Sequence, residues 1–236
     1  MELLKLEKRK CPIKISLTPL GGYYLLVEFE INGDKHKLCP SHAVSMQFLE
    51  FMSAAYMLYC EKNGCDCHNH TFINKNRREV YIDKNDPRLS VVKTWLMWNE
   101  EGPSARITLY REVEQADLSP VADKPDPVRI EIEYSAGYPC QGEHFTYSVD
   151  GKDLCYAIGK AGTDAIKEYG FHGYFYSTGY DDCLGDWIDI NQLLFFKAYA
   201  LGAMEVRDFT EVRMDNNSCY YRTDFSKELE LLLFDM

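Results

Sequence analysis

A stretch in the middle of the chain, suited to neither a helix nor a strand, most constrains how this sequence folds. Residues 115–127 contain three prolines and three aspartates, with little periodic apolar signal. Proline lacks a backbone donor and its ring clashes inside a helix, so this segment is predicted to be a linker. The 236-residue chain is then predicted to consist of an N-terminal α+β half at 1–114, the linker, and a C-terminal α+β half at 128–236.

The two halves differ in charge. Residues 1–118 contain 16 Lys and Arg and 16 Asp and Glu, whereas residues 119–236 contain 10 and 21. The net charge of −11 therefore comes wholly from the second half. Direct nucleic-acid binding is not expected, because it requires a basic face that neither half provides. A concentrated negative charge instead favours a positively charged protein partner.

Hairpin signals occur in both halves. The apolar-rich run Val27–Ile31 is followed by Asn32–Gly33, a pair that favours a two-residue hairpin turn. The segment Phe145–Gly151 repeats this pattern, with Asp–Gly in place of Asn–Gly. Two interpretations are open: an internal duplication of a hairpin-strand-helix unit, or the chance recurrence of common turn residues.

The remaining periodicity predicts about three helices among mainly antiparallel sheets, which is an α+β fold. Helices are predicted at 41–59, 156–169 and 192–201, each with a glycine beyond its end. Asp86–Pro87 also allows a helix through Trp95 instead of a strand. The predicted strands, besides those of the first hairpin, are 72–82 as a hairpin, 91–98, 106–113, 128–134, 204–214, 218–222 and 228–234.

The N-terminal sequence and the cysteines predict a cytoplasmic protein. Charged residues occur throughout residues 1–10, which therefore lack the uninterrupted apolar core of a secretory signal. The most apolar segment, 43–60, is amphipathic and marginal in length for a membrane span, so no membrane association is expected. Nine cysteines, an odd number spread through the chain, are predicted to be reduced thiols.

One cluster contains residues of the types that bind zinc. Three thiols and two imidazoles occur within eleven residues: Cys60, Cys65, Cys67, His68 and His70. Four such donors suit tetrahedral zinc, but the spacing is not that of a standard zinc knuckle. A helix end with a buried cysteine is the alternative interpretation. If these residues bind zinc, the purified protein is expected to contain near-stoichiometric zinc. Replacing Cys65 or Cys67 should then remove the metal.

A cysteine-dependent enzyme is the other chemical alternative. Asp182–Cys183 precedes a predicted helix and resembles the Asp-Cys start of the NlpC-type cysteine peptidases. Those enzymes use a histidine downstream of the cysteine, whereas none follows His172 here. Cys140 and His144 form a second pair, but an acidic environment disfavours the reactive thiolate. A binding protein is therefore favoured over an enzyme.

An aromatic and acidic run indicates where a partner binds. Tyrosines anchor interfaces at low entropic cost and carboxylates steer a basic partner, although aromatic runs also fill cores. The favoured hypothesis is a non-enzymatic acidic protein-binding module, such as an immunity or antitoxin-type inhibitor of a basic, nuclease-like protein. A structural scaffold component is a further alternative. The predicted partner-binding residues are Tyr174, Tyr176, Tyr180, Asp181, Asp182, Asp186 and Trp187.

Overall fold

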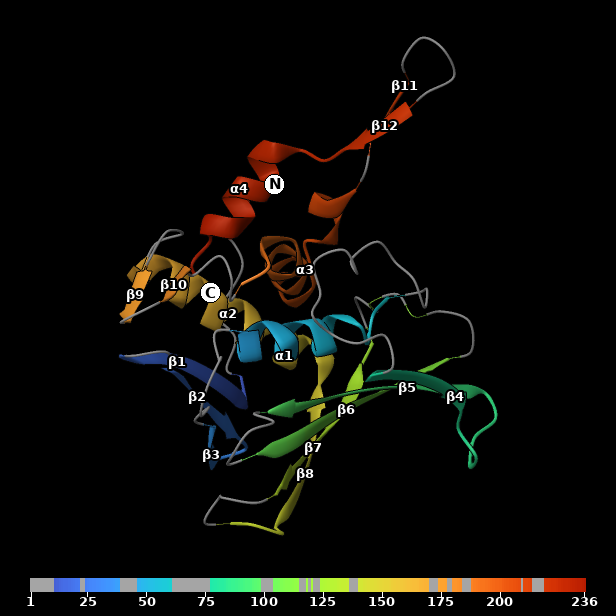
Figure 1. Ribbon diagram of the computed structural model, residues 1–236. Coiled ribbons are helices and arrows are strands. Elements are labelled where there is room, and N and C mark those ends of the chain that lie inside the picture. The colour runs from blue at the N-terminus through green and yellow to red at the C-terminus, as the bar shows by residue number, and fades with distance from the viewer. Residues whose placement is uncertain are drawn as a thin grey trace.

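Two antiparallel sheets lie beneath a group of helices (Figure 1). The computed structural model describes residues 11–21, 24–38, 46–60, 77–98, 104–114, 118, 120, 124–135, 140–169, 174–177, 180–183, 188–208, 210–213 and 219–236. The strands are β1 Ile13–Gly21, β2 Tyr24–Ile31, β3 Asp34–Leu38, β4 Arg78–Ile82, β5 Leu89–Trp98, β6 Ala105–Glu114, β7 Pro127–Tyr134, β8 His144–Asp150, β9 Tyr174–Ser177, β10 Tyr180–Cys183, β11 Thr210–Arg213 and β12 Cys219–Arg222. The helices are α1 Met46–Tyr56, α2 Gly151–Tyr169, α3 Ile190–Leu201 and α4 Phe225–Leu233, with a 3-10 helix, η5, at Met204–Arg207. This architecture confirms the predicted α+β class.

The smaller sheet has the order β1-β2-β3 and contains the predicted hairpin turn. Asn32 and Gly33 join β2 to β3 with φ angles of 53° and 97°. Positive φ at both central residues is what a two-residue type I′ turn requires, and Asn–Gly meets that requirement at little steric cost. Strand β2 pairs antiparallel with both neighbours, so its buried face is held on either side.

The larger sheet has the order β4-β5-β6-β7-β8 and takes strands from both halves of the sequence. Strands β5 and β6 form the predicted hairpin, and the alternative of a helix from Asp86–Pro87 through Trp95 is wrong. The proline- and aspartate-rich segment joins β6 to β7, which are neighbours in the sheet. Strand β4 covers the later part of the predicted 72–82 hairpin; residues 71–76 lie outside the described residues.

The second Asp–Gly pair does not form a hairpin turn. Strand β8 ends at Asp150 and helix α2 begins at Gly151, so the likeness between the halves ends here. The backbone N–H of Gly151 donates to the carbonyl oxygen of Asp126 at 2.6 Å. A Cβ atom at position 151 would collide with the Asp126 carboxylate and the Tyr59 hydroxyl. Glycine is needed at position 151 because two other segments approach it closely. At position 33, in contrast, glycine is favoured because the turn requires a positive φ.

The predictions for the last forty residues need two corrections. Residues 228–234, predicted as a strand, lie mainly in helix α4, whose N-cap Asp224 accepts from the backbone N–H groups of Ser226 and Lys227. The predicted strand at 204–214 begins instead with η5, and β11 follows. Helix α3 begins at Ile190, two residues earlier than predicted, and its N-cap is Asp189. The predicted Gly202 C-cap is confirmed by its φ of 68°.

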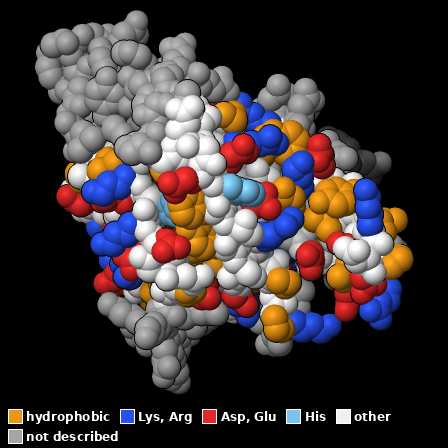
Figure 2. Space-filling view, turned by 90° about the horizontal axis from the view of Figure 1, so that it is seen from below, with side chains coloured by type: hydrophobic (Ala, Val, Ile, Leu, Met, Phe, Trp, Pro, Cys, Tyr) orange, Lys and Arg blue, Asp and Glu red, His pale blue; other side chains and the backbone are white. Residues whose placement is uncertain are grey.

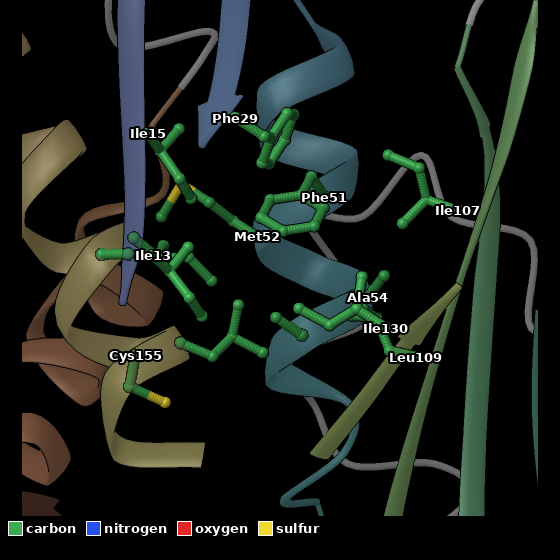
Figure 3. Close-up of a cluster of buried hydrophobic side chains, with 14 of the residues drawn as sticks. Ile13, Ile15, Phe29, Phe51, Met52, Ala54, Ile107, Leu109, Ile130 and Cys155 are labelled. Atoms are coloured by element: carbon green, nitrogen blue, oxygen red, sulfur yellow. The ribbon is translucent and has the colours of Figure 1, made fainter. Parts of the chain in front are cut away.

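The core lies where helix α1 packs between the two sheets (Figure 3). Ile13 and Ile15 of β1 lie on one side of α1, and Ile107 of β6 lies on the other. Edge-to-face aromatic contacts connect these layers, because the ring of Phe29 lies 5.0 Å from that of Phe51 and 5.9 Å from that of Trp98. Residues from before and after the central segment therefore share one core. Among the described helices, none is long and apolar enough to cross a membrane.

Candidate functional site

Five of the seven predicted partner-binding residues lie on one two-stranded hairpin, β9–β10. In its backbone register Tyr176 pairs with Asp181, and Tyr180 pairs with Ser177. Tyr174 and Asp182 lie on the same hairpin, and strand β9 contacts β1. The hairpin thus brings tyrosines and aspartates that are several residues apart in sequence onto adjacent strands. The other two predicted residues, Asp186 and Trp187, lie outside the described residues.

The predicted zinc cluster is described only at its first residue. Cys60 is buried beyond the end of α1, and its Sγ lies 3.6 Å from the carbonyl oxygen of Tyr56. Burial raises the pKa of the Cys60 thiol to about 11, so the neutral thiol predominates at neutral pH. Cys65, Cys67, His68 and His70 lie outside the described residues. In the described part of the chain, no group of three or more His, Cys, Asp or Glu is placed to hold a metal ion.

A buried ion pair joins strand β6 to the proline- and aspartate-rich central segment. Arg111 Nε on β6 donates to Asp126 Oδ1 at 2.7 Å, and both side chains are almost fully buried. The Tyr199 hydroxyl donates to Asp126 Oδ2 at 2.6 Å, and the Arg111 guanidinium lies 4.2 Å from the centre of the Tyr59 ring. Nearby Cys155 is fully buried, and burial raises its thiol pKa, which makes it a poor nucleophile. The arrangement is suited to holding elements together rather than to binding a ligand from solvent.

The outer face of the five-stranded sheet carries a shallow polar hollow of about 240 Å³. The Tyr110 hydroxyl donates to Glu131 at 3.0 Å, and the Arg129 guanidinium stacks 4.0 Å from the Tyr110 ring centre. Burial and the bond to Glu131 raise the pKa of Tyr110 to about 12. Because both signs of charge occur here, the hollow has no strong preference for an anion or a cation. The lining residues are Lys93, Arg106, Thr108, Tyr110, Glu131, Glu133 and His144.

Figure 2 shows the protein from below, and Lys and Arg side chains are interspersed there with Asp and Glu. In the first half of the chain, five carboxylates have a cationic partner within 3.2 Å. Paired charges of this kind largely cancel and produce little field at a distance. The five pairs are Glu28–Lys37, Glu30–Lys14, Glu50–Arg77, Glu79–Lys93 and Asp86–Arg88.

Near the C-terminus, four carboxylates have no such partner. Glu205 lies in η5 and Asp208 directly follows it, while Glu228 and Glu230 lie on α4, which packs against η5. No described residue forms an ion pair with any of the four. These four carboxylates lie on neighbouring elements and outnumber Arg207 and Lys227, the two cations of the same elements, so a net negative charge remains there.

Helix α4 also exposes three large apolar side chains. Phe225, Leu229 and Leu233 are 72%, 41% and 61% exposed, and their spacing of four residues places them along one face of the helix. On the opposite side, Leu231 is fully buried against η5 and the end of α3. Here we call Phe225, Leu229, Leu233 and the carboxylates Glu228 and Glu230 the α4 surface. Sequence reasoning missed it, although Asp224 and the four-residue spacing are helix signals.

A buried lysine fixes how α4 is attached. Lys197 of α3 donates through Nζ to the carbonyl oxygens of Leu232 and Phe234, at 2.8 and 2.7 Å, and to the Thr163 hydroxyl at 3.0 Å. These three acceptors match the three donors of an ammonium group. Burial, together with the positive charge of Lys167, lowers the pKa of Lys197 to about 7. The two carbonyls belong to the last turn of α4 and the residue after it, so Lys197 anchors the C-terminal end of this helix.

In comparisons with known proteins, no family model, curated protein or solved structure matches the chain.

Proposed function

We propose that this protein is a non-enzymatic protein-binding module whose partner is a basic protein. The observation that supports the proposal is a group of four carboxylates near the C-terminus that have no ion-pair partner among the described residues. Within the described residues, Glu205, Asp208, Glu228 and Glu230 form no ion pair and lie on neighbouring elements, whereas five carboxylates of the first half are each paired with a cation. An uncompensated field of one sign accelerates the encounter with a partner of opposite sign and disfavours partners of like sign.

The partner class follows from the same charge. A nuclease-like protein carries a basic surface because it neutralises phosphates, and an acidic protein that occupies this surface acts as its inhibitor. An immunity or antitoxin-type inhibitor is therefore the specific form that we propose. In such a complex the carboxylates replace phosphate groups, and the inhibitor itself catalyses no reaction.

The test is capture of partners by the tagged full-length chain from cells of its source at low salt, followed by elution with increasing salt. A basic protein bound at a 1:1 ratio and released by salt is the expected result. Its association rate is then measured with a variant lacking four unpaired charges: Glu205→Gln, Asp208→Asn, Glu228→Gln and Glu230→Gln. The control variant loses four paired charges instead: Glu28→Gln, Glu30→Gln, Glu79→Gln and Asp86→Asn.

Both variants change the net charge equally. A difference between their association rates therefore reports the effect of where the charges lie. We expect the first variant to associate several-fold more slowly and the control to associate at nearly the original rate. Failure to capture any basic protein contradicts the proposal. Equal slowing by both variants contradicts the assignment of the field to the C-terminal acids.

A further inference from the structure

We infer that the α4 surface is the anchor of the interface, and that it inserts Phe225, Leu229 and Leu233 into an apolar groove on the basic partner. This inference rests on the proposed function and names the surface through which that function operates. The mode is a helix in a groove, in which side chains spaced by about one helical turn occupy successive pockets.

Phe225, Leu229 and Leu233 are all exposed to solvent. They are among the few large apolar residues that the described part of the chain leaves exposed, and they lie on one helix. Single exposed apolar residues are common, but a row on one helix face provides a continuous contact. The other exposed large apolar residues, Val80, Tyr81 and Ile82, follow one another on edge strand β4.

Helix α4 is held in one orientation. Leu231 is buried against η5 and α3, and Lys197 binds the carbonyl oxygens of Leu232 and Phe234. The N-terminal end is capped by Asp224. Because both ends and one face are fixed, the exposed row cannot turn inward without breaking these contacts. A preorganised helix loses less conformational entropy on binding than a flexible segment does.

The charges beside the exposed row indicate what kind of partner it fits. Glu228 and Glu230 lie on opposite sides of the exposed row, because each is about 100° from Leu229 around the helix. Glu205 of the adjoining η5 and Asp208 directly after it add two negative charges, against one positive charge from Arg207. An apolar row with carboxylates on both sides complements a groove with apolar walls and basic rims. A second copy of this chain does not fit, because its α4 surface would bring like charges together.

The experiment compares two apolar substitutions of similar exposure in the full-length chain. Leu233→Ser changes the α4 surface, and Ile82→Ser changes β4 at a side chain that is 57% exposed. The binding partner is the basic protein captured from the source cells, and its dissociation rate is measured at low and at high salt. A third variant, Leu229→Ser, tests a second anchor in the same row.

We expect Leu233→Ser and Leu229→Ser each to weaken binding by about tenfold, mainly through faster dissociation and at both salt concentrations. Ile82→Ser should bind as the original chain does. Circular dichroism checks that each variant remains folded. If a basic protein binds all three variants equally well but loses affinity in the four-carboxylate variant, the α4 inference is wrong while the proposed function survives. If no basic protein is captured, the proposed function fails as well.

Discussion

Nε2 of His36, on the edge strand of the smaller sheet, lies 2.6 Å from the hydroxyl oxygen of Tyr147 on the larger sheet. Tyr147 donates its own hydrogen to Asp34 at 3.1 Å, so it accepts the hydrogen of His36 Nε2. The other ring nitrogen, Nδ1, lies 2.8 Å from the Tyr134 hydroxyl, which donates to it when the imidazole is neutral. These hydrogen bonds connect the two sheets at their edges.

Acidification should weaken this junction. Burial lowers the pKa of His36 below its usual 6.5, with Asp34 opposing the shift. Below pH 6.5 the unfolded chain therefore binds a proton that the folded chain does not, and the free energy of unfolding falls by up to about 1.4 kcal/mol per pH unit until the folded pKa is reached. Urea unfolding between pH 7.5 and 5 should show this slope, and His36→Gln should reduce it.

The control for this prediction is His144→Gln, because that side chain is more than half exposed and lies on the outer face of the sheet. We expect the control to leave the pH dependence nearly unchanged. An identical slope in the original chain and in His36→Gln would show that the junction does not sense pH.

Loss of one partner of the buried ion pair should cost more than loss of both. Asp126→Asn leaves the Arg111 guanidinium buried without its counter-charge, which is expected to lower the free energy of unfolding by about 3–5 kcal/mol. Adding Arg111→Met to that variant removes the unpaired charge and should restore part of the loss. Chemical denaturation of the two single variants and the double variant measures the coupling. Additive losses would contradict this account.

Local sequence signals predicted the parts of the fold that local chemistry determines. Asn32–Gly33 forms a turn because its two residues tolerate positive φ, which depends on no distant group. Asp150–Gly151 has nearly the same chemistry, yet it starts a helix because Asp126 and Tyr59 crowd that position. Residues 228–234 lie mainly in a helix instead of the predicted strand, because Asp224 caps its N-terminal end and Lys197, from another part of the chain, binds the carbonyl oxygen of Leu232.

The candidate site was predictable only in its charge and residue types. The composition indicates the acidic half and the sequence contains the aromatic and acidic run, but the pairing of its two strands depends on the fold. The α4 surface was missed because burial of Leu231 and exposure of Leu229 depend on how α4 packs against η5. Similarly, the pairing of Arg111 with Asp126 joins residues that no local pattern relates.

Replacing Lys197 should loosen the C-terminal helix. Lys197→Met leaves the carbonyl oxygens of Leu232 and Phe234 without their donor, an expected loss of about 1–3 kcal/mol. Amide hydrogens of α4 should then exchange faster with solvent, while those of α1 remain protected. The matched control is Lys160→Met, which removes a largely exposed lysine that pairs with Asp164 on α2. Equal exchange in α4 for both variants would contradict the anchoring role.

This lysine also predicts a rise in stability with pH. Its pKa is about 7 in the folded chain, compared with the usual 10.5. Between these values the unfolded chain binds the proton and the folded chain does not, so the free energy of unfolding should increase as the pH rises from 7 to 9. The difference between the original chain and Lys197→Met, measured by denaturation, should increase in that direction. A difference that is constant with pH would show that Lys197 stays charged when folded.

The aspartates predicted from the sequence to bind the partner give a separate test of how the partner is recruited. Replacing Asp181, Asp182 and Asp186 with alanine should slow association with the basic partner several-fold at low salt, and much less at high salt, because salt screens the steering field. The dissociation rate should change little if these acids lie at the rim of the interface. A control variant changes the net charge by the same amount in the N-terminal half, and so separates the effect of charge location from that of net charge. Its three substitutions are Glu79→Ala, Glu112→Ala and Glu114→Ala. Unchanged association in the first variant would exclude the hairpin from the steering surface, whereas faster dissociation would place its aspartates inside the interface.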